Sequence, residues 1–151
     1  MKTIVTIWWI LAAGASMWAR PVPYWPYDKL TREADLIVIA TPASVRDTGV
    51  KTTFPGIARD NQPVDAIQME ATFAVLATFK GAESLKTLHF HYLREAAPQT
   101  VSVNGPALVS FNSKEKKRYL LFLRREKDGR YAALTGQTDP AGSVKDLGTY
   151  P

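Results

Sequence analysis

Two histidines stand one residue apart in the stretch LHFHYLRE at residues 88–95, and they are the only histidines of the chain. Side chains two positions apart on a β-strand lie on one face, about 6.5 to 7 Å apart along the chain. Two imidazoles at that spacing can converge on one zinc ion. Cysteine is absent, so thiolate ligands are excluded. His89 and His91 are therefore the first candidates for metal chemistry.

Glu70 is the third candidate ligand. Residues 67–79 and 87–93 are expected to form neighbouring antiparallel strands joined by the turn KGAE at 80–83. Matching their apolar faces requires paired residue numbers to add to an odd sum. A sum of 161 places Glu70 directly opposite His91, and 163 places it on the diagonal, still within reach of a shared ion.

The alternative is that both histidines are water-facing residues of a half-buried strand. The apolar residues Leu88, Phe90 and Tyr92 alternate with them and must face the core, so the histidines face outward. An exposed strand face lacks the second shell that braces tight metal sites. We therefore expect no bound cofactor and keep zinc as the alternative.

Strand patterns account for most of the chain after residue 35. The clearest runs from residue 67 to 79, where every odd position is apolar, and a strand that long must bend or coil as barrel strands do. LIVIA at 36–40 predicts a buried strand, and RYLLFLRR at 118–125, apolar on both faces, predicts a central one. The predicted core contains seven residues: Met69, Phe73, Val75, Leu88, Phe90, Leu121 and Leu123.

Turn and helix signals complete the expected architecture. Asp28 is placed to cap a short helix over residues 29–34, Asn104 and Gly105 predict a tight hairpin, and DGR at 128–130 predicts another turn. The tail from Asp139 predicts at most one helical turn. Together these patterns predict an all-β fold, a barrel of five to six strands with one short N-terminal helix.

The first 19 residues have the layout of a secretory signal peptide: Lys2, then an uncharged apolar stretch, then small residues before a possible cleavage after Ala15 or Ala19. An uncleaved anchor helix is the alternative, although the apolar part is short for a membrane span. Residues 20–151 are then a single domain, because the remaining length suits one core. We expect a periplasmic or secreted protein that is not an integral membrane protein after cleavage.

Residues 47–63, DTGVKTTFPGIARDNQP, predict a long mobile loop between the first two strands, because glycine, proline and an Asp-Asn pair interrupt the pattern. Loops of this length are often functional. Lys51, Phe54 and Arg59 are the candidate ligand contacts in it, with Gln68 beside them at the start of the next strand.

Three segments together resemble a class of small exported bacterial domains: ADLIVIATPASV, ATFAVLATFKGAESLKTLHFHYL and KKRYLLFLRREKDGRYAALTG, spanning residue 34 to about residue 136. That class is similar to the OB-type barrel of netrin-like modules and tissue inhibitors of metalloproteinases, although those modules usually rely on disulfides. The resemblance implies ligand binding over strands two and three and through the loop between strands one and two. It points to residues 47–63 and to Gln68, Glu70, His89 and His91.

Two classes of function remain. The first, which we favour, is a non-enzymatic binding module for a protein or an envelope component. The second is a metal-binding protein or metal-dependent enzyme using His89, His91 and Glu70; the chain has no nucleophile-elbow, zincin or phosphate-loop motif. No nucleic acid is expected as a partner, because export argues against it and the basic residues of KEKKRYLLFLRREK flank a buried strand.

Overall fold

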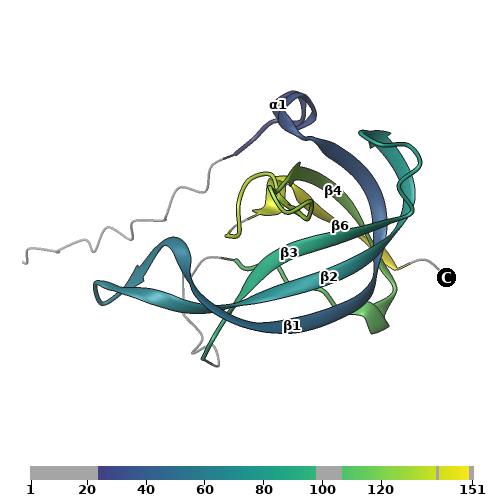
Figure 1. Cartoon of the computed structure of the whole chain (residues 1–151). Helices are drawn as coiled ribbons and strands as arrows, with labels where there is room; N and C mark the ends of the chain where they lie inside the picture. The colour runs from purple at the N-terminus through teal and green to yellow at the C-terminus, as the bar shows by residue number, and fades with distance from the viewer. Residues whose placement is uncertain (1–23, 98–106, 139, 150–151) are drawn as a thin grey trace, which may run out of the picture.

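Five strands close into a ring. The structure, a computed structural model, describes residues 24–97, 107–138 and 140–149. Its strands follow the order β1-β2-β3-β5-β4-β6, and a further pairing of β1 with β4 closes the first five into a barrel-like ring (Figure 1). The elements are α1 (Tyr27–Glu33), β1 (Leu36–Arg59), β2 (Gln62–Lys80), β3 (Thr87–Glu95), the 3-10 helix η1 (Ser113–Glu115), β4 (Lys117–Arg125), β5 (Tyr131–Ala133), the 3-10 helix η2 (Pro140–Gly142) and β6 (Val144–Thr149). The predicted all-β architecture with one short helix is confirmed.

The main core fills the ring. Phe73, Leu88, Phe90, Leu121 and Leu123 are fully buried there, as predicted, and the other two predicted members, Met69 and Val75, pack against them half-buried. Phe111 stands edge-on to four rings, with centroid distances of 4.9 to 5.3 Å to Phe73, Phe90, Tyr92 and Tyr119. Such edge-to-face contacts add to the burial of apolar area.

A second core lies outside the ring under α1. The strand β4 is apolar on both faces because one face points into the ring and the other, through Phe122, packs on Leu30, Ala34 and Ile37. This confirms its predicted central position, between β1 on one side and β5 and β6 on the other. The helix begins two residues before the predicted start; Pro26 occupies the N-cap, so the expected capping role of Asp28 is wrong.

The period-two pattern of β2 holds in its middle and fails near its C-terminal end. Two bulges interrupt the ladder with β1: Ile37 pairs with Lys80 and Val38 with Thr78, which skips Phe79, and the next irregularity skips Leu76. Each extra residue shifts the pattern by one position, so Phe79 is 65% exposed although the alternation predicts an inward side chain.

Three further expectations concern the tail, the signal peptide and the predicted hairpin. The tail was expected to hold at most a helical turn, but Val144–Thr149 forms β6 on β4. The sequence of β6 carries little alternation, because each of its residues is half-buried or exposed and none is buried. The expected signal peptide and the hairpin at Asn104 and Gly105 lie outside the described residues.

Candidate functional site

Residues 47–67 form a β-hairpin, called the arm below, in which β1 and β2 continue past the ring (Figure 1). The prediction of a mobile loop over 47–63 is therefore wrong. Asp60 and Asn61 turn the chain, both with positive φ (51° and 61°), which is the geometry of a two-residue hairpin turn whose twist suits the strands. Asp and Asn tolerate this left-handed region better than most other residues.

The residues that interrupt the pattern are absorbed as ladder irregularities. The register between β1 and β2 shifts once between Asp47 and Lys51 and again between Thr53 and Ala58. Gly49 and Gly56 lie in these two shifts with φ of 72° and 70°, a conformation that L side chains rarely adopt. Glycine and proline thus mark bulges here, and the strand continues through them.

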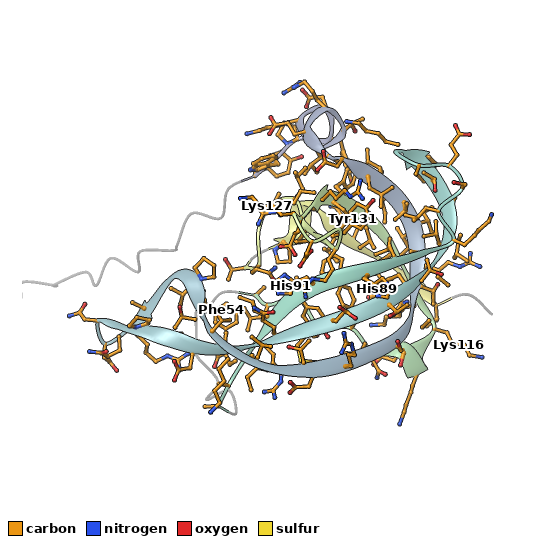
Figure 2. The ribbon with its side chains drawn as sticks, viewed as in Figure 1. Phe54, His89, His91, Lys116, Lys127 and Tyr131 are labelled. Carbon is orange, nitrogen blue, oxygen red and sulfur yellow. The ribbon has the colours of Figure 1, made fainter. Side chains whose placement is uncertain are left out.

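Phe54 anchors the arm. Its side chain is only 3% exposed and packs with the buried Ala66 and Leu93, supported by the half-buried Ile57, Val64 and Leu108. Figure 2 shows Phe54 beside the arm, at the side of the ring where β3 ends. Phe54, expected to contact a ligand, thus has its aromatic ring inside a small core of the protein itself.

The other predicted ligand contacts stay accessible. Lys51 is exposed on β1 opposite Ile67. Arg59 has a half-exposed side chain and lies 3.5 Å from a carboxylate oxygen of Glu95 at the end of β3. Gln68 is half-buried on β2, and its backbone carbonyl accepts a hydrogen bond of 2.8 Å from the Thr48 hydroxyl.

A cleft of about 560 Å³ opens between the arm tip and the end of β3. The lining includes Arg59 and Glu95 together with the acidic residues Asp60 and Asp65. The structure thus gathers one of the predicted contact residues, Arg59, into a concave surface, while Lys51 lies further back along the arm.

Next to the arm, a row of charged groups crosses the outer face of three strands. Arg46 on β1 pairs with Glu70 on β2, and Glu70 pairs with His91 on β3, which is the first of the two predicted registers, with a sum of 161. Arg46 donates from Nε and Nη2 to Glu70 Oε1 at 3.0 and 2.9 Å, and His89 Nδ1 lies 3.6 Å from the same oxygen. The Glu70 carboxylate is therefore already engaged by a guanidinium.

His91 is held by the connection between β4 and β5. Its Nδ1 lies 3.0 Å from Glu126 Oε2, its side chain is 13% exposed, and its Nε2 is buried with no hydrogen-bond partner in the described structure. The expectation that both histidines sit in water is wrong for His91 and holds for His89, whose side chain is 56% exposed. The strand alternation was correct, but the β4–β5 connection covers the outer face there.

This arrangement limits the chemistry available. A carboxylate only accepts hydrogen bonds, so Nδ1 carries the proton in the His91–Glu126 contact, as in many sites where a carboxylate orients a catalytic or ligating imidazole. The other nitrogen, Nε2, is buried and so does not face a substrate. Among residues 24–97, 107–138 and 140–149, no group of three or more potential ligands is placed to hold a metal ion.

Two more ion pairs flank the row. The Arg94 guanidinium, helped by the Gly49 amide, lowers the pKa of Asp47 below its ordinary value. Arg130 does the same to the pKa of Asp128 through a hydrogen bond of 2.8 Å. Asp47 and Asp128 therefore stay charged to a lower pH than free aspartate does. Each holds the arginine that it contacts, Arg94 or Arg130, in place.

Sequence reasoning missed the residues that close the ring beside this site. The ladder between β3 and β5 consists of one pair, Phe90 with Tyr131. Beyond it the side-chain amide of Gln137 takes the place of a strand, accepting from Leu93 N at 3.1 Å and donating to His91 O at 3.3 Å. Gln137 lies 44 residues from Leu93, and Glu126 lies 35 residues from His91, so no local sequence pattern links either residue to its partner.

Comparison with known proteins gives no relative from which to carry over a function: neither a scan against protein-family models nor a search of curated proteins found a match. In the part of the chain that the structure describes, α1 is too short and too polar to cross a bilayer, and no other helix there could do so.

Proposed function

We propose that this protein is an exported, non-enzymatic binding module, and that its arm and the adjoining outer face of β2 and β3 engage a protein partner or an envelope component. The arm is the observation that carries the proposal. It adds nothing to the main core, yet it has a buried core of its own around Phe54. A preformed projection loses little conformational freedom when it binds, which favours recognition.

The surroundings support this location. Five-stranded OB-type barrels bind over strands two and three between the connections that follow strands one and four. Here those connections are the arm and the turn that carries Glu126, and the charged row of Arg46, Glu70 and His91 lies between them. The resemblance to netrin-like modules is part of the same proposal, as is export, which rests on the composition of the first 19 residues.

Two further observations favour binding over catalysis and over nucleic acid. The imidazole that a carboxylate orients has its second nitrogen buried. At the start of β4, Lys117 lies 3.2 Å from both Glu115 and Asp146, so this basic segment is at least partly neutralised within the protein.

Affinity capture from a periplasmic extract tests the proposal. Lys51→Glu combined with Arg59→Glu reverses two charges on the arm without touching its core, and Lys114→Glu combined with Lys116→Glu, two exposed positions beside β4 on the side away from the arm (Figure 2), is the matched control. A partner that the wild-type protein and the control retain, and the arm variant loses, supports the proposal. Retention by all three proteins would place the binding surface elsewhere.

A further inference from the structure

The two bulges of β2 display large apolar side chains at the end of the molecule opposite the arm tip along β1. The residues that they skip, Leu76 and Phe79, are 52% and 65% exposed. A bulge re-aims a side chain, and bulges are over-represented at sheet edges, at the rims of barrels and next to active sites. Without these irregularities the alternation would turn Phe79 inward, so the backbone itself places this ring in solvent.

This end of β2 adjoins α1. Lys80, the residue after Phe79, donates from Nζ to the carbonyl oxygens of Thr31 and Arg32, each at 2.9 Å. At the start of the same helix Tyr27 is 54% exposed, and Lys29 lies over the Trp25 ring at 3.8 Å. Exposed apolar groups and aromatic–cation pairs therefore share one end of the barrel, called the α1 end below.

The charge of the α1 end differs in sign from that of the arm. Lys145 belongs to this end because its Nζ lies over the Tyr27 ring at 5.5 Å. Seven basic residues there, Lys29, Arg32, Lys80, Lys86, Arg124, Arg125 and Lys145, outnumber four acidic ones, Asp28, Glu33, Asp35 and Glu83, which leaves +3. The arm has two basic residues and three acidic ones, Lys51 and Arg59 against Asp47, Asp60 and Asp65, which leaves −1. An anionic surface therefore attracts the α1 end and not the arm.

We propose that the α1 end binds the surface of an anionic lipid bilayer, with Leu76 and Phe79 entering the headgroup region and the basic residues facing the lipid phosphates. Aromatic and apolar side chains at the interface, combined with attraction between basic residues and anionic lipid, are the two components of peripheral membrane binding. Bound in this way, the molecule directs its arm away from the bilayer, since α1 precedes the first residue of β1 and the arm tip follows the last. The inference does not depend on the arm having a partner.

Vesicle co-sedimentation tests it. The protein is purified as the host processes it, with its N-terminus identified by mass spectrometry, and mixed with vesicles of phosphatidylglycerol and phosphatidylethanolamine or of phosphatidylcholine alone. We expect binding to the anionic vesicles, loss of it in high salt, and little binding to phosphatidylcholine. The double variant Leu76→Ser, Phe79→Ser should bind anionic vesicles at least about tenfold more weakly.

Val50→Ser combined with Leu147→Ser is the matched control, since these side chains are exposed to a similar extent, 49% and 50%, and lie on the arm and on β6. The control should bind as the wild type does, and circular dichroism should show both variants folded. Absence of wild-type binding to anionic vesicles, or binding unchanged by the Leu76 and Phe79 substitutions, would overturn the proposal. So would a wild-type dimer in sedimentation that the same substitutions dissociate, because a second copy would then cover the apolar pair.

Discussion

Substituting Phe54 by alanine should unfold the arm and leave the ring of five strands folded. Phe54 is 3% exposed, and the core that it fills contains only two other fully buried residues, Ala66 and Leu93. Truncating a fully buried phenylalanine to alanine lowers the free energy of unfolding by about 3 to 5 kcal/mol. Because the core around Phe54 is small, we expect Phe54→Ala to cost about 3 kcal/mol. A loss of about 3 kcal/mol raises the equilibrium constant for opening of the arm on the order of a hundredfold.

Amide hydrogen exchange measures this effect directly. In the wild-type protein the backbone amides paired between residues 51–53 and 65–67 should be protected. In Phe54→Ala their protection should fall on the order of a hundredfold, while amides of β4 keep theirs. Val50→Ala, at an exposed position of the arm, should change neither. If the arm amides of the wild type exchange at the rate of an unstructured peptide, or if Phe54→Ala leaves their protection intact, the arm is not an ordered hairpin built on Phe54.

Three other outcomes follow from the structure. Phe73→Ala should lower the global free energy of unfolding by about 3 to 5 kcal/mol in urea denaturation followed by circular dichroism, because the ring is fully buried among Phe90, Phe111 and Tyr119; an unchanged midpoint would show that the faces of β2 are misassigned. Burial raises the pKa of Tyr92 from 10.0 to about 12, so between these pH values the folded state keeps a proton that the unfolded state has lost. The contribution of Tyr92 to stability should therefore be full below pH 10 and fall by about 1.4 kcal/mol per pH unit between pH 10 and 12. Tyr92→Phe should flatten that decline, and an equal slope in the variant would contradict the assignment. Zinc titration by calorimetry should give no stoichiometric binding tighter than about 1 μM, because Arg46 occupies Glu70 and Glu126 occupies His91; tight binding abolished by His89→Ala would restore the zinc site.

Sequence patterns predicted those strands in which one pattern of buried and exposed residues continues over the whole stretch. The alternation centred on Phe73 locates the inner face of β2, and the apolar run around Leu121 locates a strand buried on both sides. The register between β2 and β3 also followed, since matching two apolar faces leaves few alignments, and Glu70 lies opposite His91 as expected.

The arm was mistaken for a loop because its bulges and turn use loop-forming residues. Gly49, Pro55 and Gly56 usually end strands, and the turn pair Asp60–Asn61 lacks the glycine that marks most two-residue hairpin turns. Only the partner strand and the burial of Phe54 decide in favour of a hairpin, and both depend on residues distant in the chain.

Sequence patterns predicted the strands that carry the site, but not the residues of other segments that cover it. Strand alternation turns His91 outward, but it contains no information on whether another segment covers that face. Glu126 lies in a connection 35 residues away, and the order of strands in the ring determines that it reaches His91. A sequence pattern of short period records local burial, so contacts made by ring closure escape it.

Site-specific photo-crosslinking in cells that express the full chain tests most directly whether the arm is the binding surface. A photoreactive amino acid is placed in turn at Val50, Lys51 and Leu147, three exposed positions, of which the first two lie on the arm and the third on β6. We expect a crosslinked adduct of one defined mass from both arm positions and none from Leu147. Adducts from Leu147 alone, or no adduct from either arm position, would contradict it.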